Sequence, residues 1–243
     1  MRAGARAVFH VKQSGPEATR SPENKGFSDD EVDFLARNLP TELHPLLPEA
    51  LPLLEAHLVE LEIWAPRLNL VGDGTRKEWL RRHFLDSLRS AGPLVEECGG
   101  SIESLVDVGS GAGFPGIPLA ALLRPERTLL VEPRQRRSHF LRAVARRCPA
   151  PIIEVRNERL EDLSITLPQA VVVSRATFSD LGALLTGCIS RIGTGSLVMA
   201  LCSPAAPWPE SDELRSAYET LERRAYQLPE TDRQHEVRFW RRR

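Results

Sequence analysis

A glycine-rich turn at residues 105–118 constrains this chain more than any other feature. The stretch LVDVGSGAGFPGIP begins as a short apolar run typical of a buried strand and continues into glycines at every second position. Gly109, Gly111 and Gly113 leave room for a bulky ligand beside the backbone, and the prolines that follow suit the first turn of a helix. A strand, a turn and a helix in this order present N–H groups and a positive dipole end to an anionic part of a nucleotide-like ligand. We therefore expect a nucleotide site here.

The glycine spacing fits two classes of nucleotide site. Counted from Gly111, it matches the dinucleotide fingerprint, with Glu132 at the distance of a ribose-binding acid. Counted from Asp107, the pattern Asp-x-Gly-x-Gly-x-Gly resembles the first motif of class I S-adenosylmethionine methyltransferases, in which an acid at the end of the second strand holds the ribose hydroxyls. Glu132 follows the apolar run 129–131 and serves either ligand. A corner that binds nothing is the third possibility, and the presence of corner, helix and acid in the right order argues against it.

Composition narrows the class of protein. The chain has 243 residues, enough to bury a substantial core, and no apolar run long enough to span a bilayer. Its first 25 residues lack the hydrophobic region of a secretory signal. The four cysteines are dispersed, which predicts neither a disulfide framework nor a zinc site: Cys98, Cys148, Cys188 and Cys202. We expect a cytoplasmic protein without a membrane or metal partner and, because no coiled-coil or large exposed apolar stripe is evident, a monomer.

The basic residues are clustered although the net charge is only −1. Six arginines and no acid lie between Arg134 and Arg147, and five arginines lie in residues 233–243. Arginine binds phosphate in a bidentate manner and stacks on bases, so the first cluster predicts contacts with RNA phosphates through its start, near the crevice. A solvated helix face is the alternative. The apolar stripe of this helix leaves Arg142, Arg146 and Arg147 facing outward.

The chain divides into three parts. Residues 1–27 are polar and without period, which is typical of disorder, whereas residues 28–98 predict a small helical cap with helices near 28–39, 48–65 and 77–94. Ser28 and Glu31 have the spacing of a capping box. Residues 99–243 alternate strands and helices, which predicts an α/β fold with a parallel, doubly wound sheet and a ligand crevice at the strand C-termini. The expected strands are 104–109, 127–132, 151–155, 170–174, 195–201 and 234–240, and the expected helices lie near 116–124, 135–147, 178–191 and 210–223.

Several segments, taken together and in order, resemble the bacterial ribosomal RNA small-subunit methyltransferase G family over roughly residues 50–200. They are Asn69-Leu70, the stretch RHFLDSL at 82–88, the glycine turn at 107–119, Arg136-Arg137 with Phe140-Leu141, Arg159-Leu160-Glu161-Asp162 and Val173-Ser174-Arg175-Ala176. The resemblance implies a Rossmann-like class I methyltransferase domain. It also implies transfer of a methyl group from S-adenosylmethionine to N7 of a guanine in 16S rRNA, with the rRNA or the small-subunit particle as partner.

The resemblance also assigns site residues. Gly109 and Phe114 would contact the cofactor, Glu132 would hold the ribose, and Leu160 with Glu161 would border the adenine. The remaining cofactor positions are Asp107, Ser110, Gly111, Gly113 and Arg175. Arg175 would lie near the methionine carboxylate, where a guanidinium is useful, and a structural salt bridge is the alternative. The RNA side would comprise Asn69, Arg82, His83, Asp86, Arg134, Arg136 and Arg137. From spacing alone, His83 and Asp86 are equally an ordinary surface pair on a helix.

What is absent favours one reaction. After the fourth strand the chain reads SRAT at 174–177 instead of the Asn/Asp-Pro-Pro-aromatic motif of exocyclic amino methylation, and no cysteine is placed to attack a pyrimidine. Guanine N7 has a lone pair and no proton to remove, so methylation there requires proximity and electrostatics and no catalytic acid or base.

The substrate side departs from the family pattern in two places. Asn69-Leu70-Val71 stands where many relatives have Asn-Leu-Thr, and residues 199–204 lack the usual Leu-Lys-Gly, for which the tail at Arg241–Arg243 is a candidate source of charge. A non-catalytic RNA- or cofactor-binding relative therefore stays open as the second hypothesis. A nicotinamide-dependent oxidoreductase is the third, and the segment at Ser174-Arg175 argues against it.

Overall fold

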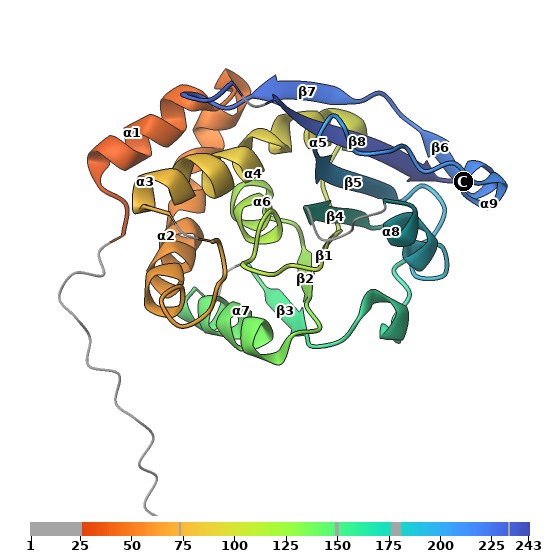
Figure 1. The fold of residues 1–243 in the computed structure, drawn as a ribbon, viewed down its shortest axis with the longest axis horizontal. Coiled ribbons are helices and arrows are strands. Elements are labelled where there is room, and N and C mark those ends of the chain that lie inside the picture. The colour runs from red at the N-terminus through yellow and green to blue at the C-terminus, as the bar shows by residue number, and fades with distance from the viewer. Residues whose placement is uncertain (1–25, 73, 149–150, 176–180, 233) are drawn as a thin grey trace, which may run out of the picture.

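The computed structural model describes residues 26–72, 74–148, 151–175, 181–232 and 234–243, so the predictions for residues 1–25 and for 176–177 lie outside the described residues. An eight-stranded sheet has the order β3-β2-β1-β4-β5-β8-β6, and β7 pairs with β8 (Figure 1). The strands are β1 Ser104–Val108, β2 Arg127–Val131, β3 Ile153–Arg156, β4 Val171–Arg175, β5 Leu197–Cys202, β6 Tyr218–Thr220, β7 Arg224–Gln227 and β8 Gln234–Arg242.

The first five strands are parallel, which confirms the doubly wound α/β prediction. Helices α6 (Gly116–Leu123) and α7 (Gln135–Arg147) follow β1 and β2, the short helix η3 (Leu160–Asp162) follows β3, and α8 (Leu181–Cys188) lies between β4 and β5. The strand order reverses between β1 and β4, and ligands of open α/β sheets bind beyond the strand C-termini at such a point.

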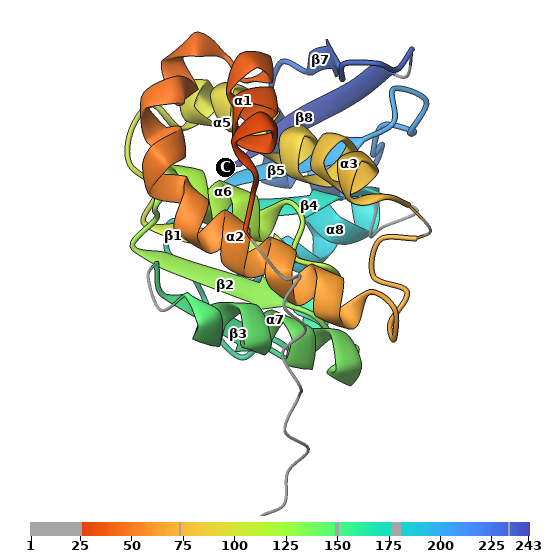
Figure 2. The same ribbon diagram turned by 90° about the vertical axis from the view of Figure 1, so that its left-hand side faces the viewer.

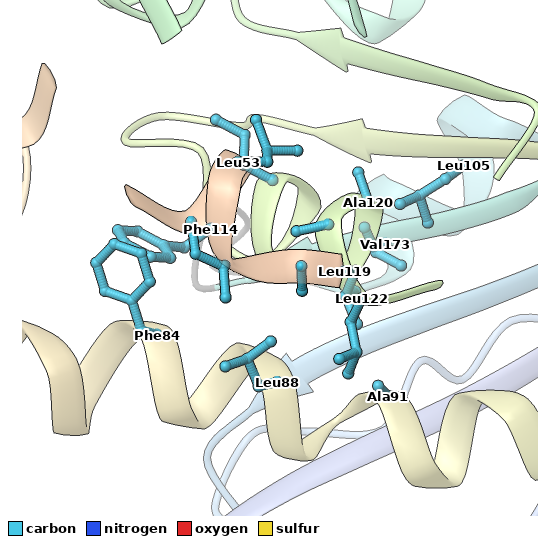
Figure 3. Close-up of a cluster of buried hydrophobic side chains, with 14 of the residues drawn as sticks. Leu53, Phe84, Leu88, Ala91, Leu105, Phe114, Leu119, Ala120, Leu122 and Val173 are labelled. Atoms are coloured by element: carbon cyan, nitrogen blue, oxygen red, sulfur yellow. The ribbon is translucent and has the colours of Figure 1, made fainter. Parts of the chain in front are cut away.

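Alternate residues of the strands feed two separate apolar clusters, one on each face of the sheet. Leu105 and Val173 belong to the cluster shared with α6, α7 and the N-terminal helices, whereas Val106 and Val172 pack with α8. Figure 3 shows the first cluster, in which Phe84 lies beside Phe114 of the glycine turn. The sheet is therefore covered on both faces, which explains why its parallel strands are continuous apolar runs in the sequence.

The N-terminal helices are α1 Asp29–Asn38, η1 Thr41–Leu46, α2 Leu47–Trp64, α3 Arg76–Trp79, η2 Leu80–Leu85, α4 Asp86–Arg89 and α5 Ala91–Cys98. The Ser28 capping box is present, with Glu31 N donating to the Ser28 hydroxyl and Ser28 N donating to the Glu31 carboxylate. Helix α2 packs along α6 and α7 (Figure 2). Within the segment expected to be disordered, Phe27 is placed edge-on against Phe84, with ring centroids 5.7 Å apart.

The helix expected at 77–94 is interrupted. Between α3 and α4 the chain forms a π-helical segment, η2, which contains Arg82 and His83. Single π turns inside α-helices are rare and often accompany functional sites, because they re-aim side chains that regular α spacing would place elsewhere.

The C-terminal segment differs from the prediction in three ways. Helix α9 spans only Asp212–Ala217, and the strands β6 and β7 were not expected. Tyr218 leaves the helix because its ring is buried and its hydroxyl donates to the Leu185 carbonyl of α8 at 2.9 Å. Strand β8 runs antiparallel to β5, with Cys202 opposite Glu236 and Leu197 opposite Arg241. The expectation that Arg241–Arg243 supplies charge to the pocket is therefore wrong, since that tail lies at the other end of β5.

Candidate functional site

The glycine turn between β1 and α6 reverses direction through left-handed backbone. Gly109, Gly111 and Gly113 have φ values of 71°, 56° and 84°, a region that side chains disfavour. The N–H groups of Gly109 and Ser110 donate to the Val131 carbonyl at 2.8 and 3.1 Å. The turn therefore closes mainly on the end of β2.

The N–H groups of the turn were expected to point at an anionic ligand. For two of them, those of Gly111 and Gly116, this expectation is wrong, because they donate to carboxylates of the protein. Gly111 N donates to Glu132 Oε2 at 2.8 Å, and Gly116 N, at the start of α6, donates to Asp107 Oδ2 at 3.1 Å. Two carboxylates thus occupy the positive end of the turn and of the helix. A pyrophosphate would have to compete with these carboxylates for the two N–H groups, which argues against the dinucleotide alternative.

Asp107 lies beneath the turn with a fully buried side chain. Burial raises the pKa of its carboxyl from 3.8 to about 7. A Cβ on Gly116 would stand 2.5 Å from the Asp107 carboxylate, so only glycine allows this contact. Among the described residues Asp107 Oδ1 has no hydrogen-bond partner. An unpartnered buried carboxylate oxygen suits a cationic or hydrogen-donating ligand.

Glu132, predicted to hold the ribose, is also buried and oriented by backbone. Its Oε1 accepts from Arg134 N and its Oε2 from Gly111 N, both at 2.8 Å. Each carboxylate oxygen has two lone pairs, so both keep capacity for a ribose hydroxyl. The Glu132 oxygens and the buried Asp107 Oδ1 are carboxylate hydrogen-bond acceptors. They fit S-adenosylmethionine, which carries two cationic groups and no phosphate.

His57 on α2 supports the turn, a role that the sequence did not indicate. Its Nε2 lies 2.7 Å from the Ala112 carbonyl, and its ring is fully buried against Phe84, Phe114 and Phe140. Burial lowers the pKa of His57 to about 3, so the ring is neutral and donates from Nε2. Its place in the apolar stripe of α2, between leucines, was the one available signal.

Arg175, at the end of β4, brings three predicted residues together. Its Nη2 lies 3.0 Å from His83 Nδ1, its Nη1 lies 3.4 Å from Asp86 Oδ2, and its guanidinium carbon lies 5.1 Å from the Phe114 ring centroid. Asp86 is only 4% exposed, and the His83 ring stacks on Phe114 with centroids 5.2 Å apart. The interpretation of His83 and Asp86 as a surface pair is therefore wrong, because His83 in the π-helical segment and Asp86 directly after it both point into this cluster.

The protonation of this cluster follows from its burial. Burial, and then the positive charge of Arg175, lower the pKa of His83 to about 4. A guanidinium only donates, so the neutral His83 ring accepts at Nδ1. Burial alone would raise the pKa of Asp86, but its contacts with His235, Arg175 and Tyr226 outweigh burial and hold the pKa below its ordinary value. The cluster thus contains one cation and one anion around a neutral histidine.

A cavity of about 820 Å³ opens beside Arg175, between η2 and the β7–β8 hairpin. Tyr226 donates its hydroxyl to Asp86 Oδ1 at 2.6 Å, and His235 Nδ1 lies 3.3 Å from the same oxygen. No sequence pattern indicated either residue, since Tyr226 lies 140 positions from Asp86. Arg82 also lines this cavity.

The other predicted residues lie around the turn in different roles. The Ser110 hydroxyl donates to the Asp107 backbone carbonyl at 2.8 Å. Arg137 Nη2 donates to the Asn69 backbone carbonyl at 3.4 Å. Leu160 is buried against Gly187 of α8, where a Cβ would stand 2.6 Å from its side chain. Glu161 is exposed and lines a second cavity of about 670 Å³, over α8.

The arginines of α7 separate into two groups. Arg134 and Arg136 are exposed at the start of the helix, shortly after Glu132, whereas Arg137 is half-buried, with Nη1 3.5 Å from where a Gly111 Cβ would stand. The outward prediction is wrong for Arg142, which is half-buried and whose Nη2 donates to the Val155 carbonyl at 3.4 Å. Arg147 is exposed but forms an ion pair with the buried Glu60, with Nη2 2.5 Å from Oε1.

The loop after β5, which replaces the family's Leu-Lys-Gly, is held by Arg238 of β8. This side chain is fully buried, and its Nε lies 2.5 Å from Glu236 Oε1. Its other nitrogens donate to the carbonyls of Pro204, Ala206 and Pro207 at 3.3, 2.9 and 3.2 Å. The loop is therefore anchored by a buried side chain.

Comparison with known families identifies the chain. The family described as rRNA small subunit methyltransferase G matches residues 50–237. The chain belongs to this family. Within the described residues, no helix could span a membrane and no group of side chains could hold a metal ion.

Named members of methyltransferase G extend the match. The protein of Rhodospirillum rubrum is 43% identical over 63% of this chain and 72% of its own length. The protein of Desulfotalea psychrophila is 35% identical over 72% of this chain and 77% of its own. The resemblance inferred from the short segments is thus confirmed. As a methyltransferase G, the chain is an rRNA methyltransferase, and rRNA is its substrate.

Solved structures share the fold of this chain. The N-methyltransferase NodS of Bradyrhizobium japonicum WM9, in complex with S-adenosyl-L-homocysteine, aligns with a TM-score of 0.53 and 13% identity. The alignment covers 75% of this chain and 98% of NodS. Magnesium protoporphyrin IX methyltransferase of Synechocystis PCC 6803 aligns with a TM-score of 0.51 and 10% identity. This alignment covers 77% of this chain and 97% of that methyltransferase. Both have the Rossmann-like class I methyltransferase fold.

Proposed function

We propose that this chain transfers the methyl group of S-adenosylmethionine to N7 of a guanine in 16S rRNA, acting as a monomer on the rRNA or the small-subunit particle. Family membership supports the rRNA substrate and the cofactor. The observation that carries the cofactor assignment is the pairing of Glu132 with Gly111 N and of Asp107 with Gly116 N, which disfavours a pyrophosphate at these two N–H groups.

When bound, S-adenosylmethionine would supply a methyl carbon on a sulfonium: the carbon would bond to N7, the electron pair of the carbon–sulfur bond would leave on the sulfur as a neutral thioether, and the positive charge would pass to the guanine. In this proposal, Glu132 holds the ribose hydroxyls and Leu160 with Glu161 borders the adenine. Arg175 binds the methionine carboxylate, because its guanidinium lies over the Phe114 ring of the turn and lines the cavity.

The residues around the cavity orient the reactants and take no proton from the acceptor. N7 has no proton to lose, and the neutral His83 is engaged by Arg175, so no general base is required. Asp86 is ionised and buried next to the cavity, where a fixed negative charge favours a ring that becomes positive during the reaction. Arg134, Arg136, Asn69 and Arg82 would face the RNA.

The experiment is to incubate 16S rRNA and small-subunit particles, both lacking this modification, with the protein and S-adenosylmethionine. Cleavage at 7-methylguanine, read by primer extension, locates the product. We expect one cofactor-dependent 7-methylguanine. Cofactor binding without methylation of either substrate would favour the non-catalytic alternative, and methylation at another base atom would overturn the reaction proposed here.

A further inference from the structure

The cavity beside Arg175 has an aromatic wall that the cofactor assignment leaves unexplained. Tyr226 of β7 and His235 of β8 are directly opposite each other in the antiparallel register, so both side chains lie on one face of the hairpin. Their rings are stacked, with centroids 5.7 Å apart and planes at 26°, and both line the cavity. Two stacked rings along a cavity of this size offer a surface to a third flat ring.

One buried carboxylate fixes this ring pair relative to the glycine turn. Asp86 Oδ1 lies 2.6 Å from the Tyr226 hydroxyl and 3.3 Å from His235 Nδ1, and Asp86 Oδ2 lies 3.4 Å from Arg175 Nη1. Arg175 in turn lies over the ring of Phe114. A continuous set of side chains therefore joins the ring pair to the turn where the methyl donor would lie.

We propose that Tyr226 and His235 form a stacking platform that holds the acceptor guanine with N7 toward the methyl donor. This inference rests on the function proposed above and names the residues that position its substrate. The side chain of His235 is 24% exposed, whereas the Tyr226 ring has the Arg89 guanidinium over it, 5.8 Å from its centroid, so His235 presents the outer ring. Aromatic stacking accepts any base, so the platform positions the guanine and does not select it.

The platform also suits the charge change of the reaction. A guanine methylated at N7 is positively charged, and a cationic ring is attracted to an aromatic face. The buried Asp86 carboxylate, which contacts the edges of both rings, adds a fixed negative charge beside them. A platform of this kind binds the guanine ring more strongly as positive charge develops on it. The platform acts only by positioning the guanine and by electrostatic attraction.

The test compares His235→Ala with His235→Phe. The first variant removes the outer ring, and the second keeps a flat ring without the contact to Asp86. We expect His235→Ala to raise the KM for 16S rRNA about 5- to 150-fold, the range of losing one base–aromatic stack. We expect His235→Phe to stay within about 3-fold of wild type. The dissociation constant for S-adenosylmethionine, measured by calorimetry, should be unchanged in both.

Gln227→Ala is the matched control on the same hairpin. Gln227 is exposed, adjacent to Tyr226 on β7, and its side chain points to the opposite face of the strand. The substitution also removes the hydrogen bond from Gln227 Nε2 to the Thr231 carbonyl, so it reports on any loosening of the hairpin turn. We expect a KM equal to that of wild type, and a rise matching that of His235→Ala would overturn the platform.

A binding measurement separates stacking from a purely structural role. The imidazole resonances of His235 should shift on titration with 7-methylguanosine monophosphate in the wild-type protein, and Tyr226→Phe should retain the shift. No shift, or a KM for His235→Phe as high as that for His235→Ala, would overturn the inference. If the wild-type protein makes no 7-methylguanine in 16S rRNA, the proposed function fails; if it does and His235→Ala equals wild type, only the platform fails.

Discussion

Asp107 places a titratable group under the turn that would hold the cofactor, and this makes folding stability depend on pH. Its pKa is about 7 in the folded protein against 3.8 in the unfolded chain. The folded state therefore holds the proton more tightly. The resulting stability is fully present below about pH 4 and is lost as the pH rises through about 7.

Replacing Asp107 by asparagine should remove this dependence. The Asp107→Asn variant keeps an acceptor for Gly116 N and carries no titrating proton at this position. We expect the free energy of unfolding of the wild type to fall relative to the variant between pH 4.5 and 7.5, by on the order of 3 kcal/mol. Urea unfolding across this range is the measurement. Parallel pH profiles for the two proteins would show that Asp107 titrates normally.

The two neighbouring arginines at the start of α7 should behave differently. Arg136 is exposed, so Arg136→Gln should weaken RNA binding and reduce the salt slope by about 1, without changing cofactor affinity. Arg137 donates from Nη2 to the Asn69 carbonyl, and its Nη1 lies beside Gly111 of the turn. Arg137→Gln should therefore also weaken binding of S-adenosylmethionine. RNA affinity measured against salt, together with calorimetry, separates the two effects.

Arg146, exposed near the other end of the same helix, provides the control. It lies about 15 Å along the helix axis from Arg136, at 1.5 Å per residue, and away from the crevice. Arg146→Gln should leave the salt slope unchanged. An equal loss of RNA affinity in Arg136→Gln and Arg146→Gln would mean that the whole helix face, and not its crevice end, attracts RNA.

At the scale of elements, strand β8 anchors the substrate side of the molecule through Arg238. Arg238→Met would leave the buried Glu236 with Arg223, a mostly exposed partner. We expect a loss of about 3–5 kcal/mol in the free energy of unfolding. Converting Glu236 to methionine as well should recover much of this loss, because no uncompensated charge then stays buried. Urea unfolding of the single and double variants checks this, and an equally unstable double variant would contradict the charge argument.

The elements also show how far local sequence information reaches. Strands β1, β2, β4 and β5 were predictable because both faces of the sheet are covered and the strands are continuous apolar runs. The Ser28 capping box was equally local. Strands β6 and β7 were missed because residues 218–227 include good helix formers, and only their pairing with β8 makes them extended.

The same division applies to the candidate site. The glycine turn with Asp107 and Glu132 was visible in the sequence because its residues follow successive strands. The contacts of Asp86 with Tyr226 and His235, and of His57 with the Ala112 carbonyl, join residues 55 to about 150 positions apart. No periodicity or spacing encodes such contacts, since they depend on how the hairpin and α2 pack on the sheet.

At the scale of the whole molecule, the N-terminal helices, the parallel sheet and the antiparallel hairpin each supply one wall of the site. Helix α2 supports the glycine turn through His57, the sheet places Arg175, and the hairpin adds Tyr226 and His235. The parts share one apolar cluster that runs from Leu35 to Phe239. The geometry of the site therefore depends on the complete fold and not on the Rossmann-like part alone.

The central claim is that a sulfonium nucleoside, and not a dinucleotide, binds at the turn between β1 and α6. Calorimetric titration of the full chain with S-adenosylmethionine and, separately, with NAD tests this directly. We predict one site for S-adenosylmethionine, weakened by Glu132→Ala because the ribose hydroxyls lose their acceptor, and no measurable heat with NAD. Saturable binding of NAD, or no binding of S-adenosylmethionine to the folded wild-type protein, would contradict the account.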